Sequence, residues 1–153
     1  MSYSDKIYET AAETFEITCF LFPVDKDEVD GKPEEQTELS TIQTVVEFNG
    51  AAKGIIIISP SVSLLSAMAG NMLGIEDPDM KQKEEALCEV ANIISGNIAP
   101  MFSNDDEICY INPPQLLSNK SNQAGIIEDA EKESARILLN EGTAEIEVYY
   151  QIP

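Results

Sequence analysis

Four residues in one stretch of the sequence have the types and the spacing to act together at one site. They are Glu85, Glu89, Asn92 and Gly96. At about 100° per residue, an α-helix would place all four within a stripe of about 60°. A carboxylate forms charge-assisted hydrogen bonds, and a carboxamide both donates and accepts them. Such residues are also common on the solvent face of an amphipathic helix, so the stripe alone is weak evidence for a site.

The composition excludes several mechanisms. The chain has no histidine, which removes Ser–His and Cys–His pairs, and Arg136 is its single arginine. None of the three cysteines is followed by the basic loop with which a cysteine phosphatase lowers the pKa of its thiol. Chemistry in this chain must therefore use carboxylates, amides, hydroxyls or lysines.

The sequence is strongly acidic. It has 28 acidic and 9 basic residues and a formal net charge of −19. A surface of this sign repels phosphate backbones and anionic lipid headgroups within about a Debye length. We therefore expect neither a nucleic-acid partner nor a membrane partner.

The sequence predicts a cytoplasmic protein. Its apolar runs, such as Ile55–Ile58, are far shorter than the ~20 residues that span a bilayer. Acidic residues also interrupt the N-terminal region where a signal peptide would have its apolar core. Cys19, Cys88 and Cys109 are widely separated and odd in number, which favours buried thiols over a disulfide or a zinc site.

No metal or cofactor of the chain's own is predicted. The acidic segment around Gly31 is similar to a calcium-binding loop. Setting that glycine at the sixth position puts Lys26 first and Thr37 last, so the register fails. A metal shared by Glu85 and Glu89 is a second possibility, but no histidine or third helical carboxylate completes that site.

The chain is expected to form one α+β domain, residues 1–153, in which about three helices pack on an antiparallel-rich sheet. Apolar periodicity predicts the helices, and β-branched or alternating runs predict the strands. The helices, with their caps, are expected at Ser4–Cys19, Ser61–Gly74 and Met80–Phe102. The strands are expected at Leu39–Phe48, Gly54–Ile58, Glu107–Ile111, Arg136–Leu139 and Thr143–Ile152, and exposed loops at Pro23–Gln36 and Ser118–Ser134.

Residues that follow the stripe in the sequence favour one function for it. After Glu89-x-x-Asn92 and Gly96-Asn97 comes the segment Ile111-Asn112-Pro113-Pro114. This combination resembles the CheX and CheC chemotaxis phosphatases. The order of the predicted elements is similar to that of CheX over nearly the whole chain.

Two features of this sequence can be compared with those of the family: the number of acid-x-x-Asn motifs and the residue four positions before the glutamate. CheC-like relatives can carry the acid-x-x-Asn pattern twice, but the first predicted helix here has Glu13-x-x-Glu16, so the single active helix of CheX fits better. The family's wider motif often has an aspartate or serine four residues before its glutamate. This chain has Glu85 at that position.

The resemblance implies an enzyme that removes the phosphoryl group from the aspartate of a phosphorylated CheY-like response regulator. Asn92 would orient the attacking water, and Glu89 would pair with the active-site lysine of the regulator, which also supplies Mg²⁺. Glu85, Gly96, Pro113 and Pro114 would contribute to the partner-binding surface, whereas Asn97 lies off the stripe and is expected to be structural. The alternative function is a non-catalytic module that binds a receiver domain.

The resemblance also implies a homodimer, because CheX-like proteins pair through their sheets. The segment from Ala144 to Ile152 alternates apolar and polar residues, as an edge strand or a paired strand would. We therefore expect a sheet-mediated homodimer that leaves Glu89 and Asn92 facing outward.

Overall fold

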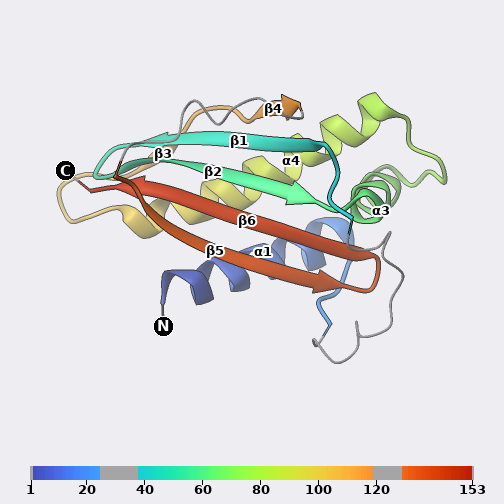
Figure 1. Cartoon of the computed structure of the whole chain (residues 1–153), viewed down its shortest axis with the longest axis horizontal. Coiled ribbons are helices and arrows are strands. Elements are labelled where there is room, and N and C mark those ends of the chain that lie inside the picture. The colour runs from blue at the N-terminus through green and yellow to red at the C-terminus, as the bar shows by residue number, and fades with distance from the viewer. Residues whose placement is uncertain (1, 25–37, 119–128, 153) are drawn as a thin grey trace.

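The computed structural model describes residues 2–24, 38–118 and 129–152, and it confirms the predicted α+β class. An antiparallel sheet forms one layer, and helices lie behind its strands as a second layer (Figure 1). The segment considered for calcium, most of the predicted loop Pro23–Gln36 and residues 119–128 of the second predicted loop lie outside the described residues.

The sheet has six strands in the order β3-β1-β2-β6-β5, and β4 also pairs with β1. Both β3 and β4 run antiparallel to β1, at different places along it. The last strand, β6, lies between β2 and β5 and is therefore paired on both sides. The strands are β1 Ile42–Asn49, β2 Lys53–Pro60, β3 Tyr110–Ile111, β4 Gln115–Ser118, β5 Glu131–Leu139 and β6 Gly142–Gln151.

The core lies between the helices and one face of the sheet. Ile56, Ile58 and Val148 point to this face and have no exposed surface. The predicted apolar side of the first helix, from Ile7 to Cys19, is fully buried against them. The α-helices are α1 Tyr3–Cys19, α3 Val62–Leu73 and α4 Met80–Ile98, followed by the 3₁₀ turn η2 Ala99–Phe102.

Two helix boundaries differ from the prediction. Ser2 caps α1 in place of Ser4, because Asp5 completes a capping box with Ser2. Ser4 lies inside the helix and donates a hydrogen bond of 2.9 Å to Glu133. The long helix ends at Ile98 and continues to Phe102 only as a 3₁₀ turn, since Pro100 has no N–H with which to extend the α-helical pattern.

The predicted strand Glu107–Ile111 is shorter in the structure, because β3 begins only at Tyr110. The side chain of Asn104 accepts hydrogen bonds from the backbone N–H groups of Asp106 and Glu107, at 2.9 and 2.7 Å. Such bonds hold the preceding backbone in a turn and keep it out of the sheet.

The predicted loop Ser118–Ser134 is wrong at both of its described ends. Ser118 belongs to β4, a strand that the sequence did not predict, and β5 begins at Glu131 instead of Arg136. Strand β5 is at the border of the sheet, where alternating polar side chains can remain in water. Polarity therefore favoured a loop where an edge strand forms.

The second face of the sheet, here called the open face, is covered by none of the described helices (Figure 1). Ile55 and Ile57 point to this face, and both are buried. Their neighbours include a Lys132–Glu147 ion pair with an N–O distance of 3.0 Å. The open face is thus an apolar centre inside a charged border.

Candidate functional site

Helix α4 holds the stripe, and its N-terminal cap and its buried side explain why it is well defined. Asp79 caps the helix in a capping box with Gln82, whose backbone N–H lies 2.8 Å from the Asp79 carboxylate. The inward side of the helix is fully buried, with Leu87, Val90, Ala91, Ile94 and Ile98 packed in the core, as predicted. Burial of that side fixes the rotation of the helix about its axis and so determines which residues face water.

All four stripe residues lie on the exposed side of α4: Glu85, Glu89, Asn92 and Gly96. Within the described part of the chain, the side chains of Glu85, Glu89 and Asn92 make no hydrogen bond and no ion pair. Their carboxylates and amide are thus available to a partner.

The segment between β3 and β4 flanks the stripe on one side. The backbone N–H of Asn112 donates to the Glu47 carbonyl of β1 at 2.8 Å, which holds this segment beside α4. Pro114 is half-buried there, whereas Pro113 is exposed and does not line the hollow described next. The structure therefore brings Pro114, but not Pro113, to the stripe.

A hollow of about 460 Å³ lies between α4 and this segment, and we call it the α4–β4 hollow. It shares Glu85, Glu89 and Asn92 with the stripe. Leu116 and Cys88 were not predicted as site residues, because β4 was not predicted and a thiol beside the stripe belongs to no motif. The complete lining is Lys81, Glu84, Glu85, Cys88, Glu89, Asn92, Pro114 and Leu116.

Gly96 is exposed and lies next to Ile111 of β3. A Cβ atom added at Gly96 would meet only the Ile111 Cδ1 atom, at 3.9 Å, which is an ordinary van der Waals contact. Nothing in the described chain thus requires a glycine here, although glycine weakens a helix interior relative to alanine.

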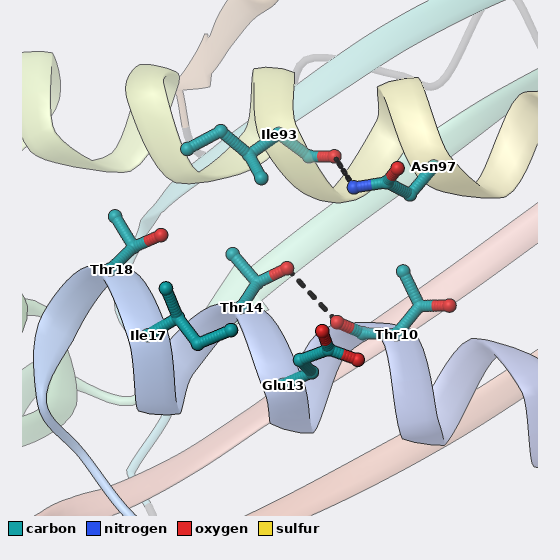
Figure 2. A pocket seen from close by; sticks show the side chains of 7 residues that line it. All are labelled: Thr10, Glu13, Thr14, Ile17, Thr18, Ile93 and Asn97. Carbon is teal, nitrogen blue, oxygen red and sulfur yellow. Dashed lines mark hydrogen bonds between the residues drawn. The ribbon is translucent and has the colours of Figure 1, made fainter.

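A second groove lies between α1 and α4 (Figure 2). Its α4 residues, Ile93 and Asn97, are on the other side of the stripe from the α4–β4 hollow by helical geometry. It has a volume of about 370 Å³ and is lined by Thr10, Glu13, Thr14, Ile17, Thr18, Ile93 and Asn97. The Asn97 amide donates to the Ile93 carbonyl at 3.0 Å, and the Thr14 hydroxyl donates to the Thr10 carbonyl at 2.9 Å. Asn97 is therefore bonded to its own helix and points into this groove.

The two cysteines with perturbed acidity are poor nucleophiles. Burial raises the pKa of the Cys19 thiol to about 12. Burial, and then the neighbouring Glu84 carboxylate, raise the pKa of the Cys88 thiol in the α4–β4 hollow. Because the thiolate is the reactive form, Cys88 is an uncharged, weakly polar part of the wall at neutral pH.

In residues 2–24, 38–118 and 129–152, no three His, Cys, Asp or Glu side chains lie close enough together to hold a metal ion, so Glu85 and Glu89 lack a third ligand there. No helix in the same ranges has the length and apolar character needed to cross a membrane.

Comparisons with known proteins relate these features to a family. A family model described as chemotaxis phosphatase CheX matches residues 42–138, more than half of the chain, including the whole stripe and both prolines. No curated protein matches the chain in sequence.

Similar solved structures include three from chemotaxis proteins, and at their low identities they show a shared fold. CheX from Vibrio vulnificus has a TM-score of 0.72 and 16% identity, covering 99% of this chain and 97% of that chain. A putative chemotaxis protein from Desulfovibrio vulgaris Hildenborough has a TM-score of 0.75 and 15% identity, with coverage of 99% and 97%. A chain of the CheX–CheY–BeF3–Mg²⁺ complex from Borrelia burgdorferi has a TM-score of 0.68 and 18% identity, with 98% of each chain covered.

Proposed function

Because this chain belongs to the CheX family of chemotaxis phosphatases, we propose that it hydrolyses the aspartyl phosphate of a phosphorylated CheY-like response regulator. The observation that carries the proposal is the pair Glu89 and Asn92, exposed on one helix and without partners in the described chain. The Borrelia complex, which joins a CheX to a CheY, supports the choice of partner.

Asn92 is proposed to orient the attacking water. Its carboxamide is neutral, so it can approach a phosphoryl group without charge repulsion, and it can donate and accept hydrogen bonds at once. Phosphoryl transfer depends mainly on positioning and electrostatic stabilisation, and a side-chain amide positions the water in some GTPases. Asn92 would supply that positioning.

Glu89 is proposed to be a docking anchor that pairs with the active-site lysine of the regulator. A carboxylate placed against the phosphoryl group itself would be repelled, whereas a lysine beside that group attracts it. The Cβ atoms of residues three apart on a helix lie about 5–6 Å from each other. One regulator site can therefore receive Glu89 at its lysine and Asn92 at its phosphorus.

In this proposal, Mg²⁺ belongs to the regulator. Glu89 and Asn92 complete a site that the regulator already holds, so this chain needs no metal ligand of its own. Glu85, at the other end of the stripe, would extend the docking surface, and Gly96 would allow the regulator's backbone to come close.

A phosphate-release assay tests the function. A CheY-like receiver domain is phosphorylated with acetyl phosphate and Mg²⁺, and its dephosphorylation is followed with and without this protein. The proposal expects an accelerated release of phosphate. Binding of the regulator without acceleration would instead identify a non-catalytic receiver-binding module.

Gly96→Ala is expected to stabilise the protein and to weaken docking. The helix should gain about 0.5–1 kcal/mol, since alanine has the higher helix propensity and the space beside Gly96 accepts a Cβ. The added methyl group should hold the regulator's backbone away and raise the KM several-fold. Thermal unfolding and steady-state kinetics measure the two effects, and an unchanged KM would remove Gly96 from the docking surface.

We also propose that the protein pairs through the open face as a homodimer. The argument from the last strand is weaker than the sequence suggested, because β6 is covered by β2 and β5 within one chain. The open face supports pairing better, since Val45 and Leu117 are half-buried apolar residues on it with no described helix above them. Pairing there would leave α4 outward on both copies.

Light scattering at micromolar concentration is expected to give twice the monomer mass of 16.8 kDa. Val45→Lys should convert the dimer to monomers, because it puts an unpaired charge in the middle of the open face. Circular dichroism would verify that this variant is folded. A wild-type mass near 16.8 kDa would contradict the dimer and leave the phosphatase proposal intact.

A further inference from the structure

We propose that the α4–β4 hollow receives an apolar side chain of the response regulator, from the surface that borders its phosphorylated aspartate, and thereby selects the regulator. This inference rests on the proposed function and adds Leu116 and Cys88 to the docking surface. Neither residue belongs to the Glu-x-x-Asn motif.

The position of the hollow makes its coverage unavoidable. Glu85, Glu89 and Asn92 belong both to the stripe and to the wall of the hollow. A receiver domain has a radius of gyration of roughly 13 Å, whereas the stripe is only about two to three helical turns long. A regulator whose phosphoryl group lies over Asn92 must therefore also lie over the hollow.

The chemistry of the far wall favours an apolar occupant. Leu116 is 41% exposed, so the wall that β4 contributes to the hollow is apolar surface that the described chain leaves uncovered. Pro114 lies beside it, and the protonated Cys88 thiol faces them from α4. Leu116, Pro114 and the Cys88 thiol offer few hydrogen bonds, so a polar side chain against this wall would lose water without replacement, and an apolar side chain fits this side of the hollow better.

Two variants of the hollow test this inference. Leu116→Thr removes apolar surface from the wall while keeping a residue suited to a strand, and Cys88→Leu fills the hollow from the helix. Each should raise the KM for the phosphorylated receiver domain about tenfold and leave kcat within about twofold, because neither side chain reaches the phosphoryl group. Leu73→Thr is the matched control, since Leu73 is also apolar and exposed but lies on α3, outside the hollow.

Calorimetry with the BeF3-activated receiver domain separates this inference from the phosphatase proposal. If wild type binds without accelerating dephosphorylation, and the hollow variants bind more weakly than Leu73→Thr, the hollow is supported and the phosphatase proposal fails. If wild type is active and the hollow variants keep its KM and affinity, the hollow is excluded and the phosphatase proposal stands. A wild type that neither binds nor acts on the receiver would overturn both.

Discussion

Asn92→Ala is expected to abolish the accelerated dephosphorylation and to leave the regulator at its own intrinsic rate. Loss of the positioned water should lower kcat by about a hundredfold or more. Binding of the BeF3-activated regulator should stay within about twofold, because Glu89 and the rest of the docking surface remain. The free energy of unfolding should change by about 0.5 kcal/mol or less, since Asn92 is exposed and bonds to nothing in the described chain.

Asn97→Ala is the matched control for this prediction. Asn97 is an exposed amide on the same helix, but it points into the α1–α4 groove, away from the stripe (Figure 2). The control should retain the wild-type kcat. The water-orienting role would be wrong if Asn92→Ala kept most of its activity, or if both variants lost activity equally.

Glu89→Lys is expected to disrupt docking as well as turnover. The substitution sets an ammonium group against the regulator's lysine, where the proposal has a charge-assisted contact. Loss of a close charge pair in an interface costs about a hundredfold or more in kcat/KM, mainly through weaker binding. Steady-state kinetics and calorimetry with the BeF3-activated regulator measure the effect.

Glu16→Lys separates the local contact from the change in overall charge. Glu16 is exposed on α1, and this variant shifts the net charge of −19 by the same amount as Glu89→Lys does. It should cause no loss of affinity. Higher ionic strength should weaken the wild-type contact modestly, because exposed charges are screened. Unaltered affinity in Glu89→Lys would remove the proposed pairing with the lysine.

Local patterns predicted most of the helices. The inward residues of α1 and α4 recur with the helical period, and burial confirms them from Ile7 to Cys19 and from Leu87 to Ile98. The stripe on α4 is exposed for the same reason, since fixing one side of a helix fixes the other.

Pairing between distant segments explains what the sequence could not predict. Strand β4 is short and irregular in pattern, and it forms because its residues add to β1, which lies far earlier in the chain. Leu116 reaches the site only through that pairing, so no local sequence pattern predicted the wall that β4 contributes to the hollow. The boundary of β5 was missed for a related reason, since an edge strand carries polar residues that are typical of a loop.

The stripe on α4 contributes its side chains to neither the core nor the described hydrogen bonds of the chain, and this independence has an evolutionary consequence. Natural selection for folding would not preserve Glu89 or Asn92, so on the proposed function only selection for docking and turnover can keep them. If that proposal holds, one copy could lose Asn92 in a single step after a gene duplication and persist as a well-folded protein that binds the phosphorylated regulator without hydrolysing it. Melting temperatures would not distinguish such a copy from its parent, whereas the phosphate-release assay would.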